Sequence, residues 1–284
     1  MVSFIVSHSR DFCNSYLLTL CDGCVMIGAG KLPRRKKEPN KRKNQIERMY
    51  KMSQVIGIIG AMEEEVAQLK ALMENADTVK KAGMEFVTGS ISGKDVVVVR
   101  SGIGKVNAGI CAQILCDVFG TAMIINTGIA GSLDARIDIG DMVISTEAVQ
   151  HDMDATGFGY EYGVIPRMET SVFPADERLA ELAESACRKA NPEIQVFRGR
   201  VVSGDQFVSA KAKKDWLVQT FGGLCTEMEG GAIAQAAWLN RVPYLIIRAI
   251  SDKADDSAQM AYDAFEAEAI RHTVNLMKEL LAMV

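Results

Sequence analysis

The stretch Cys225-Thr-Glu-Met-Glu-Gly-Gly-Ala-Ile-Ala-Gln235 sets two carboxylates, Glu227 and Glu229, at the start of an Ala-rich helix. The small residues that follow the carboxylates let this helix begin close to whatever they hold. The partial positive charge at a helix N-terminus favours negative groups at the same place. The stretch therefore predicts a polar site at a junction between a loop and a helix.

A buried strand and a second polar run follow this helix. Val242-Pro-Tyr-Leu-Ile-Ile-Arg248 is apolar and rich in β-branched residues, as expected for a strand that is buried on both faces. The strand delivers Arg248, Ser251 and Asp252 at its carboxyl end. Ligands bind at this end of the strands in open α/β sheets. These three residues are therefore predicted to face a ligand site.

From Gln54 onward, short apolar runs alternate with segments of helical period. The predicted strands are Val55–Ile59, Met84–Gly89, Asp95–Arg100, Ala122–Asn126, Asp141–Glu147, Gln195–Val202 and Val242–Arg248. The predicted helices are Val66–Met73, Val106–Phe119, Asp176–Lys189, Glu229–Leu239 and Ala261–Met283. This alternation predicts an α/β fold: a single domain with a central mixed, largely parallel twisted sheet flanked by helices.

Polar or Gly-containing loops are predicted at the ends of five strands, at residues 60–65, 101–105, 127–131, 203–207 and 248–252. Neither Gly57–Gly60 nor Gly102–Gly104 completes the G-x-G-x-x-G pattern of dinucleotide-binding loops. The acidic triplet Glu63–Glu65 could serve only to complement a helix dipole. The five loops taken together, rather than any one motif, indicate a functional site.

The main part of the chain is acidic. Residues 1–51 carry 11 Lys and Arg against 4 Asp and Glu, whereas the remaining residues carry 21 against 32. An acidic body argues against nucleic acid as its partner. The 7 cysteines are odd in number and scattered through apolar contexts, which suits a reducing, cytoplasmic location. The pair Cys21 and Cys24 has no second pair and no clustered His beside it, so we expect no metal site.

The N-terminal residues 1–51 differ from the rest. The mostly apolar residues 16–30 are followed by the basic cluster Arg34–Lys37, which is the reverse of the order in a secretory signal. The apolar run is also too short to predict a membrane span. Residues 31–51 are polar, basic and without a period, so we expect them to be disordered. We therefore divide the chain into an extension, 1–51, and a folded domain, 52–284.

Seven motifs follow one another within the predicted domain: Gly57–Glu65, Ser101–Lys105, Asn126–Gly128, Phe158–Gly163, Ser203–Asp205, Glu227–Glu229 and Arg248–Asp252. In this order they resemble the 5′-methylthioadenosine/S-adenosylhomocysteine nucleosidase family of the purine nucleoside phosphorylase-like superfamily. The resemblance covers essentially all of 52–284. The residues before Met52 have no counterpart in the pattern, and Ile129 departs from the small or hydroxyl-bearing residue that is common there.

The resemblance implies hydrolysis of the bond between adenine and a 5′-thio-substituted ribose, in methionine salvage and recycling of the methyl cycle. It also implies a nucleoside phosphorylase-like fold and a homodimer that binds a small nucleoside and acts on neither nucleic acid nor a membrane. Water would be the nucleophile and a proton would assist the leaving group. The resemblance therefore implies no metal and no organic cofactor.

Catalytic roles follow from the same resemblance. Cleavage of an N-glycosidic bond produces an oxocarbenium-like ribose and a negative leaving base, so it needs an acid at the base and an activated water at the sugar. By resemblance, Asp252 protonates adenine N7, with Ser251 beside it to fix its orientation. Glu65 deprotonates the water, which Arg248 helps to place. Asp252 can hold a proton near neutral pH only if burial or neighbouring carboxylates raise its pKa.

Substrate-binding residues are implied around these groups. Glu229 would accept hydrogen bonds from the ribose hydroxyls, and Met228 would pack on the sugar. Phe207 would stack on adenine, although it could also be a plain core aromatic, and the backbone of Val208 would read the base edge. The other members of the implied set are the loop residue Gly131, Met62 and Ile103 near the alkylthio group, and Phe158 from a partner subunit.

Three alternatives remain open on the sequence. A purine or uridine nucleoside phosphorylase of the same fold would need cationic donors around a phosphate, whereas the first loop presents Glu65, which would repel it. A hydrolase acting on aminofutalosine would share the adenine and ribose machinery. A non-catalytic nucleoside-binding protein need not retain Glu65, Glu229 and Asp252 together. We therefore favour hydrolysis of methylthioadenosine and adenosylhomocysteine.

The division at Met52 leads to a first prediction. A chain that begins at Met52 should fold, dimerise and hydrolyse methylthioadenosine as well as the full chain does, because residues 31–51 lack the apolar content to offset their ordering entropy. Melting temperature, mass in solution and turnover of the two chains test this. A large loss on truncation would instead favour an extension that docks on the acidic body or on a membrane surface.

Overall fold

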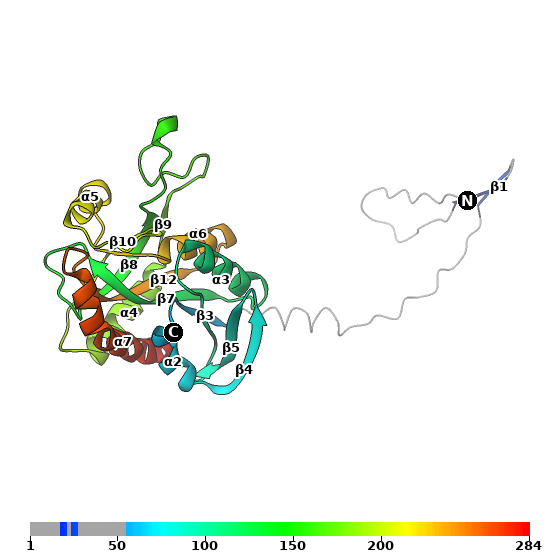
Figure 1. The fold of residues 1–284 in the computed structure, drawn as a ribbon. Coiled ribbons are helices and arrows are strands. Elements are labelled where there is room, and N and C mark those ends of the chain that lie inside the picture. The colour runs from blue at the N-terminus through cyan, green and yellow to red at the C-terminus, as the bar shows by residue number, and fades with distance from the viewer. Residues whose placement is uncertain (1–17, 22–23, 28–54) are drawn as a thin grey trace. The chain divides into compact units, whose positions relative to one another are not determined.

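The computed structural model describes residues 18–21, 24–27 and 55–284 (Figure 1). The chain divides into two units, Met1–Ile46 and Glu47–Val284. In the first unit, β1 (Leu18–Cys21) and β2 (Cys24–Ile27) pair antiparallel, with Cys21 opposite Cys24. The disorder expected for residues 31–51 concerns a segment that lies outside the described residues.

One mixed sheet runs through the second unit. Its strands follow the order β11-β10-β8-β12-β7-β3-β6-β5-β4, and the short β9 pairs with β8. Their bounds are β3 Ile56–Gly60, β4 Glu74–Lys81, β5 Met84–Ile91, β6 Lys94–Arg100, β7 Met123–Ser132, β8 Met142–Gln150, β9 Val172–Pro174, β10 Val196–Ser203, β11 Cys225–Glu227 and β12 Tyr244–Asp252. The central run β12-β7-β3-β6 is parallel, and a mixed sheet flanked by helices is confirmed.

Strand β11 closes part of this sheet on itself. It pairs parallel with β10 and antiparallel with β7, with Thr226 opposite Gly131. The strands β7, β12, β8, β10 and β11 therefore form a closed ring, whereas β3, β6, β5 and β4 continue as an open sheet.

Helices cover both faces of the sheet (Figure 1). On one face the core contains side chains of α2 (Glu63–Ala71), α4 (Glu177–Ala190) and α7 (Ala258–Met283). On the other face it contains side chains of α3 (Lys105–Asp117) and α6 (Gly230–Asn240). The neighbours Ile58 and Ile59 of β3 belong to different cores, because successive side chains of a strand point to opposite faces.

Two local features show how the sequence forms these elements. Helix α4 begins after Asp176, whose carboxylate accepts a hydrogen bond of 2.9 Å from the backbone N–H of Leu179 and so caps the helix. The strands predicted at Met84–Gly89 and Asp95–Arg100 are confirmed as β5 and β6, which form an antiparallel hairpin with Ile91 opposite Lys94. Its two turn residues, Ser92 and Gly93, both have a positive φ, as the right-handed twist of a tight hairpin favours.

Two predicted strand ends are wrong. Residues 127–131 are not a loop, because β7 runs on to Ser132 and pairs along that length with β12 and β11. Strand β12 likewise continues past Arg248 to Asp252, with a register shift between Ile250 and Asp252. Both extensions are buried, so main-chain pairing satisfies polar groups that a loop at this position would leave inside the protein without partners.

The sequence analysis did not predict β1 and β2 of the first unit, nor β4, β9, β11 and α5 (Lys211–Phe221) of the second. All eight residues of β4 are exposed, so its sequence lacks the apolar alternation of a half-buried strand. The strands β9 and β11 have three residues each, too few to show a period. A short 3-10 helix, η1 (Thr156–Phe158), lies between β8 and β9.

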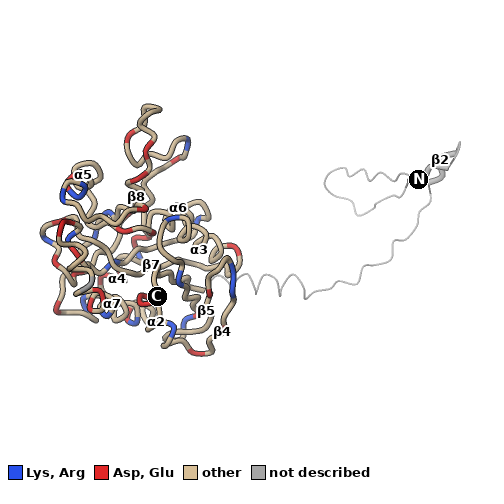
Figure 2. The backbone as a smooth tube through the Cα atoms, viewed as in Figure 1, with Lys and Arg blue, Asp and Glu red and all other residues tan. Residues whose placement is uncertain are grey.

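Charged residues of both signs lie over the helices and loops of the second unit (Figure 2). Within the part of the chain that the structure describes, no helix combines the length and the hydropathy needed to cross a membrane.

Candidate active site

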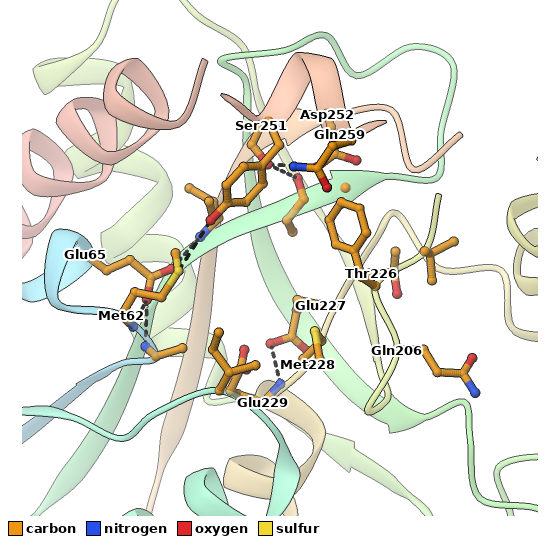
Figure 3. Close-up of a pocket in the computed structure, with 18 residues that line it drawn as sticks. Met62, Glu65, Gln206, Thr226, Glu227, Met228, Glu229, Ser251, Asp252 and Gln259 are labelled. Atoms are coloured by element: carbon orange, nitrogen blue, oxygen red, sulfur yellow. Dashed lines mark hydrogen bonds between the residues drawn. The ribbon is translucent and has the colours of Figure 1, made fainter. Parts of the chain in front are cut away.

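A pocket of about 330 Å³ opens beside the carboxyl ends of β3, β7, β11 and β12 (Figure 3). Ten of the twelve residues predicted to form the site line it: Met62, Glu65, Ile103, Gly131, Phe207, Val208, Met228, Glu229, Ser251 and Asp252. Strand ends and loops that are far apart in sequence are brought together here by the parallel centre of the sheet. The pocket therefore lies at the position that the sequence indicated.

Glu65 lies in the first turn of α2, with its carboxylate turned back onto the preceding loop. Its Oε2 accepts hydrogen bonds from the backbone N–H groups of Ala61 and Met62, at 2.6 and 3.0 Å. Its Oε1 accepts one from the N–H of Ile129 at 3.2 Å. Burial raises the pKa of Glu65, while Arg248 and these three N–H groups act in the opposite direction. The side chain can thus hold or release a proton in a fixed position.

Gly128 makes this arrangement of Glu65 sterically feasible. A Cβ atom at position 128 would lie 2.5 Å from Glu65 Oε1, closer than atoms can approach. Position 128 must therefore be Gly for the carboxylate of Glu65 to reach β7.

Asp252 ends β12 and is 3% exposed. Its Oδ2 accepts a hydrogen bond of 2.9 Å from the hydroxyl of Ser251, and its Oδ1 accepts one of 2.8 Å from the N–H of Ala254. Burial raises the pKa of Asp252, against the lowering effect of these two donors. A Cβ atom on Gly131 would come within 2.7 Å of Oδ1, so Gly131 leaves space for the carboxyl group.

Glu229 lies between β11 and α6 and is 6% exposed. The backbone N–H of Gly104 donates to its Oε1 at 2.9 Å. This hydrogen bond joins the turn between β11 and α6 to the loop that precedes α3. Burial, followed by the charge of Glu227, raises the pKa of Glu229 from its usual value of 4.5 to about 7. Glu229 is therefore a titratable carboxyl group of the pocket, and it lies below Glu65 in the view of Figure 3.

Glu227 is held by structural contacts. Its Oε1 accepts from the hydroxyl of Ser203, and its Oε2 accepts from the N–H of Gly230 at 2.7 Å. The guanidinium of Arg248 also donates to Oε2, at 2.5 Å, and both side chains are 2% exposed. Because burying an ion pair requires nearly every polar atom to be satisfied, these contacts fit a supporting role.

Arg248 does not line the pocket, although the sequence analysis assigned it to the water. Its Nη2 donates to Asn126 Oδ1 at 2.5 Å as well as to Glu227, and its Nη1 donates to the backbone oxygen of Ile247 at 3.0 Å. Its charge nevertheless lowers the pKa of both Glu65 and Glu229, though less than burial raises it. The structure thus supports an electrostatic influence of Arg248 on the carboxylates.

Apolar and aromatic side chains complete the walls. Phe207 is 47% exposed and meets Tyr262 edge-on, with ring centroids 6.2 Å apart. The hydroxyl of Tyr262 donates to Met62 Sδ at 3.4 Å (Figure 3). Ile103 is 54% exposed, and Val208 is buried. A half-exposed aromatic ring on a loop suits stacking on a planar ligand better than a place in the core.

Phe158 lies outside the pocket. It ends η1 and is 87% exposed. Its sequence neighbours form the protrusion between β8 and β9 that extends from the sheet in Figure 1. That Phe158 serves a partner subunit stays a prediction.

Sequence reasoning missed several residues of the lining, chiefly Gln206, Thr226, Gln259 and Tyr262. Gln259 and Tyr262 belong to the start of α7, which begins at Ala258, three residues before the predicted position. The apolar period of α7 showed only that this helix packs on the sheet. The sequence contains no signal that its first turn also covers the pocket.

Comparisons with known proteins agree with this fold. A family model described as "Phosphorylase superfamily" matches residues 55–282, and this is the class that the fold and the pocket define. A 5′-methylthioadenosine/S-adenosylhomocysteine nucleosidase of Bacillus thuringiensis subsp. konkukian is 42% identical over 227 residues, which are 80% of this chain and 97% of that protein. The chain belongs to the 5′-methylthioadenosine/S-adenosylhomocysteine nucleosidase family.

Solved structures are similar as well. The nucleosidase of Neisseria meningitidis in complex with methylthio-immucillin-A has 36% identity and a TM-score of 0.78, with 81% of this chain and 100% of that chain covered. The futalosine hydrolase of Helicobacter pylori has 32% identity and a TM-score of 0.78, with 82% and 100% covered.

The raised pKa of Glu229 leads to a prediction for stability. A carboxyl group whose pKa is higher in the folded chain than in the unfolded chain contributes its full stabilisation when the pH is below the pKa of the unfolded chain. This contribution is lost as the pH rises from that pKa, 4.5, through the pKa in the folded chain, about 7. Glu229→Gln carries no proton to lose. Its melting temperature relative to wild type should therefore rise between pH 5 and pH 8, by on the order of 5 °C.

Glu227→Gln is the matched control, since it leaves Arg248 buried without its carboxylate partner and should lower the melting temperature at both pH values. Thermal unfolding in buffers of matched ionic strength measures both variants. An equal offset of Glu229→Gln at pH 5 and pH 8 would show that the pKa of Glu229 is not raised.

Proposed function

We propose that this protein hydrolyses the N-glycosidic bond of 5′-methylthioadenosine and S-adenosylhomocysteine, releasing adenine and a 5-thioribose product. The observation that carries the proposal is the meeting in one pocket of three buried carboxyl groups outside the Glu227–Arg248 ion pair, those of Glu65, Glu229 and Asp252. Among the described residues that line this pocket, none is Lys or Arg. A phosphorylase would need such cations for phosphate, so water is the better nucleophile here.

Asp252 is proposed as the acid that protonates adenine N7. Both of its oxygens accept hydrogen bonds from neighbouring donors, which fixes the plane of the carboxyl group. Its raised pKa, caused first by burial, favours the protonated form that this role needs. Protonation of N7 neutralises the negative charge that develops on the base as the glycosidic bond breaks.

Glu65 is proposed as the base that deprotonates the attacking water, on the side of the pocket away from Asp252 (Figure 3). Three backbone N–H groups orient its carboxylate and leave its remaining lone pairs for the water. The charge of Arg248, behind the wall of the pocket, helps Glu65 to stay ionised. As the water loses its proton to Glu65, its oxygen bonds to the anomeric carbon.

The ribose and the base would be held between these two groups. Glu229 would accept hydrogen bonds from ribose hydroxyls, and Met228 beside it would pack against the sugar ring. Phe207 would stack on adenine, with the backbone of Val208 at its edge. Positive charge that builds on the ribose in the transition state would strengthen the contact with an ionised Glu229.

We also propose that two copies of the chain associate. Helix α3 exposes Val106 and Ile110, four residues apart and therefore on one face, at 71% and 44% exposure. Leu239 of α6 and Phe158 are exposed as well, at 60% and 87%. A second copy that covers these side chains could insert its Phe158 at the alkylthio end of the pocket. A monomeric mass in solution would contradict this proposal.

The proposed reaction belongs to methionine salvage and recycling of the methyl cycle. A cytoplasmic location is proposed on the scattered, odd set of cysteines, which suits a reducing compartment. Recovery of the activity outside the cytoplasmic fraction of the cell would contradict that location.

The identity of the nucleophile provides the first test. If water attacks, adenine release from methylthioadenosine should not depend on added phosphate, and the sugar product should be free 5-methylthioribose. Product analysis with and without phosphate measures this, with adenosylhomocysteine and aminofutalosine assayed in parallel. Phosphate-stimulated release with a sugar 1-phosphate product would indicate a phosphorylase, and turnover of aminofutalosine alone would indicate the futalosine type of hydrolase.

The two carboxyl roles can be tested separately. Asp252→Asn cannot donate an acidic proton and Glu65→Gln cannot accept one, so each should lower kcat by roughly a hundredfold or more, with a smaller effect on binding. In the wild type, kcat/KM should fall at low pH as Glu65 is protonated and at high pH as Asp252 is deprotonated. Both limbs should lie above the usual carboxyl range, because burial raises both pKa values.

Glu64→Gln is the matched control for this experiment, because Glu64 is adjacent to Glu65 but exposed and outside the pocket. It should leave both kcat and the pH profile close to wild type. Near-normal turnover in Asp252→Asn or Glu65→Gln would overturn the role proposed for that residue.

A further inference from the structure

Three residues outside the pocket form a closed cycle of hydrogen bonds through their side chains and backbone N–H groups. The ammonium of Lys105 donates to Asp152 Oδ1 at 2.6 Å. Asp152 Oδ2 accepts from the backbone N–H of Asp205 at 2.9 Å, and Asp205 Oδ1 accepts from the backbone N–H of Lys105 at 2.8 Å. Each residue therefore contacts the other two. None of the three lines the pocket.

The cycle joins three elements that carry the walls of the pocket. Lys105 is the first residue of α3 and follows Gly104, whose N–H donates to Glu229. Asp205 lies in the loop after β10 that carries Phe207 and Val208. Asp152 comes just after β8 and contacts both. The cycle thus connects the wall that holds Glu229 with the wall that carries Phe207.

The approach of the two loops is close. Gly104 has a φ of 96°, and a Cβ atom at this position would lie 3.1 Å from Asp205 Oδ1. The carboxylate of Asp205 therefore rests against the loop at a site where a larger residue would push it away. At the N-terminus of α3, the backbone N–H of Gly104 donates to Glu229 in the pocket. The N–H of the next residue, Lys105, donates to Asp205, which lies outside the pocket.

The ion pair of the cycle is shielded from solvent. The side chains of Lys105 and Asp152 are 17% and 15% exposed, unlike Lys211 and Asp215 on α5, which form a pair of the same length at 68% and 49% exposure. Shielded pairs with additional hydrogen bonds hold their geometry more firmly than exposed pairs do. By contrast, Phe207 is half exposed, so the position of its ring depends on how its loop is held.

We propose that Lys105, Asp152 and Asp205 act as a clamp of positioning residues that sets the separation of the two pocket walls, and so presents Glu229 and Phe207 to the same nucleoside. The clamp rests on the proposed nucleosidase function. It touches neither the substrate nor the reacting atoms. Its loss should weaken the binding of the base and ribose first, and the chemical step less.

Kinetics of four variants with methylthioadenosine test the clamp. Asp152→Ala removes two bonds of the cycle and Asp205→Ala removes one, so each should raise KM by roughly tenfold or more with a smaller change in kcat. Asp205→Asn retains an oxygen that can accept from Lys105 and should restore KM close to wild type. Lys105→Met combined with Asp152→Ala should cost little more than Asp152→Ala alone, because both changes open the same cycle.

Asp215→Ala is the control, since it removes the exposed Lys–Asp pair on α5, which joins no pocket walls. Its KM should equal that of wild type. If Asp152→Ala does not fold, Asp205→Ala decides the question, because residue 205 is exposed. An unchanged KM in folded Asp205→Ala, or an equal rise in Asp215→Ala, would overturn the clamp. A wild-type chain that does not cleave methylthioadenosine would instead overturn the proposed function.

Discussion

The buried ion pair of Glu227 and Arg248 is the contact on which the pocket depends. Arg248 lies on β12, Glu227 ends β11, and Asn126 of β7 accepts from the same guanidinium. Asn126 in turn donates to the backbone oxygen of Ile59 in β3 at 3.0 Å. These contacts thus tie together the four strands at whose carboxyl ends the pocket opens. Removing one partner of such a pair typically costs about 3–5 kcal/mol, because the other charge stays buried.

The pair also sets the electrostatics above it. Burial is the leading influence on Glu65 and Glu229 and raises both pKa values, whereas the charge of Arg248 lowers both and the charge of Glu227 adds to the rise at Glu229. These groups then differ through their donors: Glu65 accepts from three backbone N–H groups, Glu229 from one, and Asp252 from one N–H and one hydroxyl. One protein can therefore present carboxyl groups for different tasks within one pocket.

The sequence predicted the site better than its surroundings. Gly-containing and acidic runs at strand ends carry a local signal, and Glu65, Glu229 and Asp252 do line one pocket. Arg248 shows the limit, because its place at a strand end does not reveal that its side chain turns inward to Glu227. Tyr262 and Gln259 could not be predicted, since the packing of α7 over the pocket is a tertiary relation without a local pattern. The loop expected at 127–131 is a strand because these residues pair with β12, and Gly131 pairs also with β11, a three-residue element with no period of its own.

The closure of β11 on β7 leaves β4 at the far end of the sheet. An uncovered edge strand can recruit a strand from another molecule and begin a fibril. Here every residue of β4 is exposed, with Glu74, Asp77, Lys80 and Lys81 among them, and its register shifts between Glu74 and Asp77. Charges and an irregular ladder both oppose strand addition. The polar character that hides β4 from sequence analysis therefore also protects the protein against aggregation.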